Sequence, residues 1–150
     1  MTATFRIANI SDIDSLIELM REYYAFDRLP FDESHARAAL QGILTDDSLG
    51  RLWLIHDDGQ TVGYLVLTWG YSLEFMGRDA FLDELYIRAS HRRRGIGSEA
   101  LAFAEEICHS FGVRALHLAV ERENHCAQTF YRKAGFEDHN HYLMTKLILQ

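Results

Sequence analysis

The feature that most restricts the fold is a strand, a helix and a second strand that follow one another between residues 80 and 120. The stretch AFLDELYI has the residue types of a strand, and the residues from Gly97 to Phe111 have the pattern of a helix. Gly112 stands where a helix end favours a left-handed residue, and RALHLAV then returns to a strand pattern. This strand–helix–strand unit predicts a mixed α/β domain.

Strand and helix patterns also precede this unit. Phe5 and Ile7 alternate like a strand, and Ser11 with Asp14 three residues later predicts a capping box that starts a helix. A second helix is expected after Asp32. The stretches RLWLIH, DDGQ and TVGYLVLTW, from position 51 onward, then predict two antiparallel strands joined by a tight turn.

The end of the chain continues the alternation. A helix is expected from Asn124 to Ala134, stopped by Gly135, and the tail over residues 136–148 predicts two short strands around HNH. No linker or internal repeat interrupts the order β-α-α-β-β-β-α-β-α-β(-β). Residues 1–150 are therefore expected to form a single domain, which is long enough for one core.

Charge and composition exclude several classes of function. The 150 residues are 48% hydrophobic and 25% charged, as is typical of a soluble globular protein. The formal net charge of -7 argues against nucleic acid as the partner and favours encounter with a small cationic molecule. No apolar run approaches the ~20 residues that cross a bilayer, and no signal-peptide pattern opens the chain, so a cytoplasmic protein without membrane contact is expected.

Cysteine and histidine positions predict neither redox chemistry nor a metal site. Cys108 and Cys126 form no CxxC pair, so buried structural thiols are expected. The histidines include one H-x-H, but no further cysteine or acid stands at a recognised ligand spacing. Six of the eight histidines lie in the second half of the chain and include this H-x-H: His91, His109, His117, His125, His139 and His141.

Three consecutive arginines precede two closely spaced glycines in HRRRGIGSEAL, residues 91–101. A helix N-terminus has unpaired backbone N–H groups and partial positive charge, and glycine lets the backbone approach a phosphate. Gly95 and Gly97 suit this role, and Arg92, Arg93 and Arg94 add charge. A P-loop is excluded because GK[ST] is missing, and a dinucleotide-binding fold is disfavoured because six polar-rich residues separate the strand from Gly95. A glycine-capped helix with a solvated basic turn stays an alternative.

Arg92-Arg93-Arg94-Gly95-Ile96-Gly97 resembles the [RQ]-x-x-G-x-[GA] acetyl-CoA loop of the GNAT superfamily of N-acetyltransferases. Residues 124–136, NHCAQTFYRKAGF, are similar to the family's N-x-x-A-x-x-[FL]-Y-x-x-x-G-F segment. FLDELYI and RGIGSEAL look like the spermidine/spermine branch. The resemblance implies a GNAT fold of mixed α+β class, with a central mixed, mostly antiparallel sheet flanked by about four helices. It also implies a homodimer.

The resemblance implies acetyl-CoA as co-substrate and no metal. The backbone amides from Arg93 to Ser98 would hold the diphosphate, and the backbone of residues 85–87 would pair with the pantetheine arm like an added strand. Asn124 would hydrogen-bond that arm. The implied cofactor residues are Leu85, Tyr86, Ile87, Arg92, Arg93, Arg94, Gly95, Ile96, Gly97, Ser98, Asn124, Ala127 and Tyr131.

Tyr131 is implied as the acid that protonates the departing thiolate, because phenol and thiol pKa values lie near ~10 and ~8.5. An alkyl ammonium with a pKa near ~10.4 must lose a proton before attack, so a base is expected. Asp83 and Glu84 are both candidates, and Asp83 aligns better with the acid of the polyamine branch. Carboxylates and aromatic faces suit an ammonium group, and the candidates to bind it are Tyr23, Tyr24, Asp27, Glu33, Tyr71, Glu74 and Asp79.

The expected function is therefore acetyl transfer from acetyl-CoA, by direct attack, to the primary amine of a polyamine, a diamine or a similar small cation. Acetylation of a protein N-terminus or lysine side chain is one alternative, which would need an open groove. A non-catalytic acyl-CoA-binding sensor is another, which the presence of Tyr131 with Asp83 and Glu84 disfavours.

Overall fold

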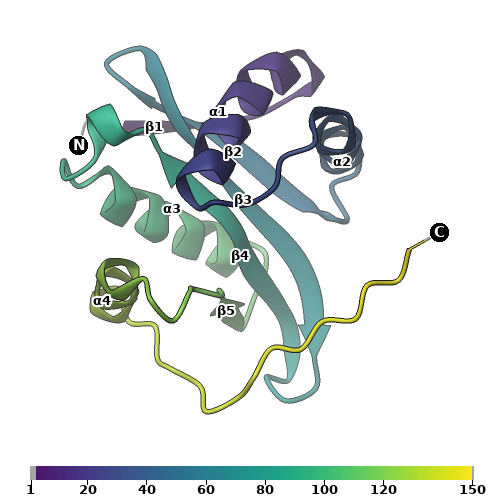
Figure 1. Cartoon of the computed structure of the whole chain (residues 1–150). Helices are drawn as coiled ribbons and strands as arrows, with labels where there is room; N and C mark the ends of the chain where they lie inside the picture. The colour runs from purple at the N-terminus through teal and green to yellow at the C-terminus, as the bar shows by residue number, and fades with distance from the viewer. Residues whose placement is uncertain (1–2, 150) are drawn as a thin grey trace. The chain divides into compact units, whose positions relative to one another are not determined.

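A five-stranded sheet organises the first 119 residues (Figure 1). The computed structural model describes residues 3–149 and divides the chain into two compact units, Met1–Ala119 and Val120–Gln150. Neighbouring strands follow the chain, and the first four are antiparallel while the last runs parallel to its neighbour, which confirms the mixed, mostly antiparallel sheet. The strands are β1 (Ala3–Ile7), β2 (Gly50–Asp57), β3 (Gln60–Ser72), β4 (Gly77–Ile87) and β5 (Ala115–His117).

Three helices of the first unit cover the two faces of this sheet (Figure 1). They are α1 (Ile13–Phe26), α2 (Glu33–Thr45) and α3 (Ile96–Ser110). The buried side chains of α1 and α2 cluster with Leu52 and Leu54 of β2. Phe103 of α3 instead contacts Trp53, with ring centroids 5.3 Å apart. Because successive residues of a strand face opposite sides, α1 and α2 cover one face and α3 covers the other.

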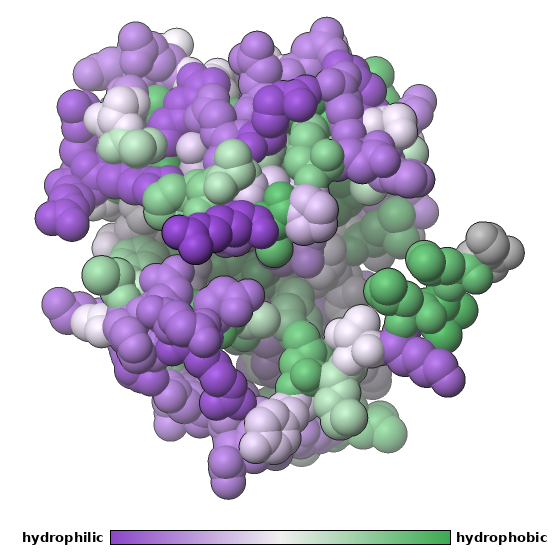
Figure 2. All heavy atoms as spheres, viewed as in Figure 1, coloured by the Kyte–Doolittle hydropathy of each residue, from purple (hydrophilic) through white to green (hydrophobic). Residues whose placement is uncertain are grey.

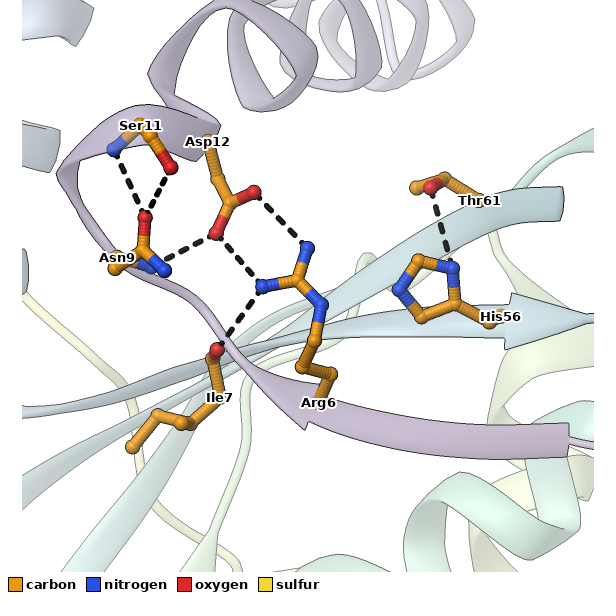
Figure 3. Close-up of polar contacts among 7 residues, drawn as sticks. All are labelled: Arg6, Ile7, Asn9, Ser11, Asp12, His56 and Thr61. Atoms are coloured by element: carbon orange, nitrogen blue, oxygen red, sulfur yellow. Dashed lines mark hydrogen bonds and ion pairs between the residues drawn. The ribbon is translucent and has the colours of Figure 1, made fainter. Parts of the chain in front are cut away.

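The start of α1 differs from the sequence prediction (Figure 3). A 3-10 turn (η1, Ile10–Asp12) precedes the helix and moves the cap upstream. The Asn9 side chain accepts a hydrogen bond from the Ser11 amide at 2.9 Å, and the Asp12 carboxylate accepts one from the Asn9 amide at 2.8 Å. Arg6 also pairs with Asp12 at 2.9 Å. The capping box is therefore Asn9 with Asp12, and the predicted box of Ser11 with Asp14 is wrong.

The second unit contains α4 (His125–Lys133), and the helix predicted after Asn124 is confirmed. The two strands predicted around HNH are wrong, because no strand occurs over residues 134–149. Their pattern had no partner strand beside it, and an isolated strand pair is marginal in water. The large side chains near the end are 74–88% exposed: Tyr142, Leu143, Met144, Leu147, Ile148 and Leu149. Figure 2 shows a group of green, hydrophobic residues at the surface beside the grey end of the chain.

Two glycines give a test of how closely β3 and β4 approach. A Cβ on Gly63 would lie 2.0 Å from the Tyr86 carbonyl oxygen, whereas one on Gly42, within α2, would meet nothing within 4 Å. Gly63→Ala is expected to lower the free energy of unfolding by about 2–3 kcal/mol, because backbone must shift. Gly42→Ala should raise it by about 0.5–1 kcal/mol, because alanine favours the helix. Urea unfolding followed by circular dichroism measures both, and equal effects of the two substitutions would contradict the close approach.

Candidate functional site

Strand β4 has one extra residue where it pairs with β3. Val66 lies opposite Glu84 and the next residue of β3, Leu67, lies opposite Leu82, so Asp83 is accommodated in a β-bulge. The bulge puts Leu82 and Glu84 on opposite faces of the sheet, although they are two residues apart. Glu84 shares the face of Val66, which belongs to the cluster under α1 and α2.

Two phenols hold the Glu84 carboxylate. The hydroxyl of Tyr24 on α1 donates to one oxygen at 2.5 Å, and the hydroxyl of Tyr64 on β3 donates to the other at 2.6 Å. Burial raises the pKa of Glu84, the two donated hydrogen bonds oppose that rise, and the negative charges of Asp83 and Asp27 add to it. Glu84 is thus an oriented carboxylate with an increased affinity for a proton.

The same neighbourhood is negatively charged around Tyr24. Burial, the hydrogen bond to Glu84 and the charge of Asp83 all raise the pKa of Tyr24, and burial raises that of Tyr64 even more strongly. Both hydroxyls therefore stay protonated and keep donating at neutral pH. Asp83 is an exposed residue, yet the protein around its carboxyl group displaces water and raises its pKa. Three carboxyl groups and aromatic rings beside one another suit an ammonium group.

The glycine loop forms a concave turn before α3. Arg93 has a φ of 63° and Gly95 a φ of 83°, so both are left-handed, whereas Gly97 lies within the first helical turn without a positive φ. The Glu99 amide donates to the Gly95 carbonyl at 3.0 Å, which begins the helical ladder and leaves the amides of residues 96–98 to external partners. A Cβ on Gly95 would meet nothing within 4 Å. This open cradle of amides fits a diphosphate.

The first of the three loop arginines is half-buried and binds other parts of the protein. The Arg92 Nε donates to the Ile87 carbonyl at 2.7 Å. Its guanidinium carbon lies 4.4 Å from the ring centroid of Phe26 and 5.5 Å from that of Tyr86. The guanidinium group of Arg92 therefore contacts both β4 and α1.

The other two arginines differ from each other. Arg94 pairs at 3.7 Å with Asp57, which is only 4% exposed at the end of β2. Arg93 is exposed, and no ion pair involves it among residues 3–149. Of the three loop arginines, Arg93 is thus the one with neither an ion pair nor a ring contact in the described part of the chain.

The last residues of β4 present an open edge. In the described chain, β5 pairs only with Asp79–Phe81 of β4. The Arg88 amide donates to the Val62 carbonyl on β3 at 2.8 Å, and the Tyr86 carbonyl lies against Gly63. Since backbone groups alternate in direction along a strand, those of residues 85 and 87 point to the open edge. Of the three residues predicted to pair with pantetheine, Tyr86 therefore turns its backbone to β3 instead.

The second predicted motif forms the helix of the second unit. The Asn124 side chain accepts a hydrogen bond from the Ala127 amide at 3.1 Å, so Asn124 is the N-cap of α4. Tyr131 stands two helical turns further on, on the same face. Its ring contacts Phe130 and Phe136, with centroids 5.3 and 5.8 Å away.

The seven predicted substrate residues fall into separate groups. Tyr23 and Tyr24 belong to the last turns of α1, with Asp27 at its C-cap, and Glu84 interacts with both Tyr24 and Asp27. The other four lie elsewhere or have partners. Glu33 binds Arg21 and Arg37 at 2.6 and 2.9 Å, and Asp79 binds His117 at 3.1 Å. Tyr71, near the end of β3, and Glu74, in the turn that follows, are both exposed.

Several residues of this site escaped the sequence prediction. Tyr64 holds Glu84, Asp57 holds Arg94, and Phe26 lies under Arg92. Each contact joins segments that are far apart in the chain. The only usable signal was the strand pattern of TVGYLVLTW, which could place Tyr64 on β3 but not opposite β4.

The two cysteines within the described residues 3–149 differ in exposure. Cys108 is buried, and burial raises its pKa to about 11, whereas Cys126 is exposed, so the expected burial is wrong for Cys126. No group of three or more potential metal-ligating His, Cys, Asp or Glu side chains occurs in this part of the chain. None of its helices is both long and apolar enough to span a membrane.

The chain is similar in sequence to known N-acetyltransferases. A thialysine N-epsilon-acetyltransferase of Mus musculus is 26% identical over 147 residues, covering 89% of this chain and 83% of the relative. A spermidine N(1)-acetyltransferase of Thermoplasma acidophilum is 26% identical over 163 residues, covering 97% and 98%.

Solved structures share the fold. An integron cassette protein from the mobile metagenome of Cole Harbour Salt Marsh has a TM-score of 0.86 and 33% identity, over 97% of this chain and 91% of that one. An aminoglycoside N-acetyltransferase in complex with CoA has a TM-score of 0.82 and 17% identity, over 97% and 94%. The sequence profile of the acetyltransferase (GNAT) family matches residues 13–136. The chain therefore belongs to the GNAT family and is an N-acetyltransferase, as its two motifs predicted.

Proposed function

We propose that this N-acetyltransferase acetylates a primary amine of a small cationic molecule, with polyamines and diamines as the first candidates. The observation that carries the proposal is the Glu84 carboxylate held by Tyr24 and Tyr64, on which the negative charges of Asp83 and Asp27 also act. A chain of net charge -7 also attracts cations at a distance. The spermidine and thialysine acetyltransferases among the relatives support a small amine as the acceptor.

The donor is acetyl-CoA, whose thioester supplies an activated acetyl group that moves from sulfur to the amine nitrogen while the thiol departs. The amides of residues 96–98 would bind its diphosphate, and Arg93 would add a positive charge. At the open edge, the backbone groups of Leu85 and the Ile87 amide would pair with its amide-bearing arm, as a peptide adds to a sheet edge, while the Ile87 carbonyl is already bound by Arg92.

Glu84 is the base in this proposal, directly or through one water. Its two oxygens are oriented by Tyr24 and Tyr64, and each oxygen keeps a lone pair for a further donor. Its raised pKa brings it closer to the operating pH, where a general base is most effective. Asp83 would contribute charge that attracts the ammonium, and it stays the alternative base.

Tyr131 is the proposed acid for the departing thiolate, and the N-cap Asn124 would donate its side-chain amide to the cofactor arm. Asn124 fits because its oxygen already accepts the Ala127 amide, which leaves its NH2 group to donate. Ala127 lies between these two residues on one helical face and would keep that face open to the donor.

The assembly and location belong to the same proposal. We expect one GNAT domain over residues 1–150, located in the cytoplasm. A homodimer is proposed because residues 142–149 expose apolar side chains that a second chain would cover. Light scattering on the purified protein distinguishes the mass of two chains from that of one, and the latter would exclude the dimer.

The base is tested by two amide substitutions at adjacent positions. Glu84→Gln is expected to lower kcat/KM by about 10²- to 10⁴-fold, because a general base contributes that much. Asp83→Asn is the matched control and should lower it by about tenfold or less, because only an attractive charge is lost. Steady-state kinetics at several pH values measure both. If Asp83→Asn costs more than Glu84→Gln, the base is assigned to the wrong residue.

The acceptor is tested by thiol release from acetyl-CoA with a panel of amines. Polyamines and diamines should be turned over faster than N-terminal or lysine-containing peptides, because the carboxyl groups favour compact cations.

Tyr131→Phe should lower kcat by about 10²-fold, because the leaving thiolate loses its proton donor. Tyr142→Phe is the control.

Turnover of peptides alone would make the chain a protein acetyltransferase. CoA binding without turnover of any amine would make it a sensor. An undiminished rate in Tyr131→Phe would remove Tyr131 from the mechanism.

A further inference from the structure

We propose that Arg92 is a positioning residue. Its guanidinium fastens the start of the glycine loop, residues 92–97 and called the donor loop below, to the end of β4 and to the last turn of α1. Phosphate binding is then left to Arg93 and the backbone amides. This inference rests on the proposed function. It departs from the sequence prediction, in which all three arginines neutralise phosphate.

The contacts of Arg92 come from two different elements. On one side, its Nε donates to the Ile87 carbonyl, the last residue of β4, at 2.7 Å. On the other, its guanidinium lies over the rings of Phe26 at 4.4 Å and Tyr86 at 5.5 Å. Phe26 ends α1, so a single side chain joins the loop, the strand and the helix.

The loop needs such a contact because its backbone is strained. Arg93 adopts a left-handed conformation at a φ of 63°, which is unfavourable for a residue other than glycine. Gly95 adopts a second one two residues later. A conformation of this kind persists only where neighbouring contacts determine it. Arg92 holds the loop immediately before this strained segment, and the pair of Arg94 with Asp57 holds it within.

Of the two ring partners of Arg92, Tyr86 is itself held in place. The Tyr86 hydroxyl donates to Glu22 of α1 at 3.1 Å, and Glu22 pairs with Arg88 at 3.2 Å. Phe26 has no such support, being 62% exposed at the helix end. In the sequence it lies between Tyr24, which binds Glu84, and Asp27, whose charge acts on Glu84. A loosened Arg92 would therefore free both the donor loop and the end of α1.

Lysine distinguishes a positioning role from a charge role. Lysine keeps the positive charge but lacks the planar guanidinium and its Nε donor, so it cannot stack on two rings while binding the Ile87 carbonyl. If Arg92 served as a charge beside a phosphate, lysine would replace it. If Arg92 positions the loop, lysine should behave like methionine.

The test measures CoA binding by calorimetry for Arg92→Lys, Arg92→Met, Arg93→Lys and Arg93→Met. Both Arg92 variants should bind CoA about tenfold more weakly, because a charge-assisted hydrogen bond and a cation–π contact are lost. They should also raise the acceptor KM severalfold at saturating acetyl-CoA. Arg93→Met should weaken CoA binding in a salt-dependent way without changing the acceptor KM, and Arg93→Lys should recover most of that loss.

Controls separate this effect from misfolding and from failure of the proposed function. Arg78→Lys, on the exposed side of β4, makes the same chemical change and should alter nothing. Urea unfolding checks that each variant is folded. Should Arg92→Lys fail to fold, Phe26→Leu offers a second test, because it removes the ring contact alone and should reproduce the weaker binding and the higher acceptor KM.

The proposal is overturned if Arg92→Lys binds CoA like the wild type, or if folded Arg92→Met and Phe26→Leu both keep the wild-type CoA affinity and acceptor KM. Wild-type protein that binds no CoA would instead reject the proposed function itself. The two failures are thus read from different samples.

Discussion

The site depends on a half-buried carboxylate, Glu84, that accepts a hydrogen bond from each of two tyrosine hydroxyls. An ionised carboxyl group away from water is costly unless hydrogen bonds replace its hydration, so the position of Glu84 requires both donors. Tyr24 comes from α1 and Tyr64 from β3, and the bulge at Asp83 turns Glu84 toward them. These two hydrogen bonds therefore fix the position of α1 relative to β3 and β4.

The donor loop uses different physics. Its proposed binding groups are backbone amides at the start of α3, which every residue type except proline can supply, so their geometry must come from what holds the loop. Arg92 bound to Ile87 and Arg94 bound to Asp57 supply two such contacts, on either side of the left-handed Arg93. Three arginines that look equivalent in the sequence thus differ in the structure: Arg92 and Arg94 hold the loop, whereas Arg93 is exposed.

The order of strands and helices could be predicted because each element has its own local pattern. The left-handed Gly112 and the N-cap Asn124 follow from residue type and spacing alone. The bulge could not be predicted, because Asp83 and Glu84 read as ordinary alternation until β3 sets the register. The cap at Asn9 was missed because a 3-10 turn moved it upstream, and the tail pattern was read as strands although strand pairing depends on a partner.

For the candidate site too, local motifs could be predicted and long-range contacts could not. The two motifs placed the donor loop and Tyr131 on helices, as residue spacing can. Spacing could not show that Asp27 and Tyr24 lie near Glu84 while Glu33 is taken up by two arginines on α1 and α2. Such long-range pairings are decided by packing of whole elements rather than by local sequence.

The most direct test of the account is an NMR titration of the Glu84 side-chain carboxyl group, identified by its loss in Glu84→Gln. The account predicts a pKa above the usual ~4.3 of glutamate, and a further rise in Tyr64→Phe, because a donor that stabilises the carboxylate is removed. A pKa at or below the usual value, or a fall in Tyr64→Phe, would contradict it.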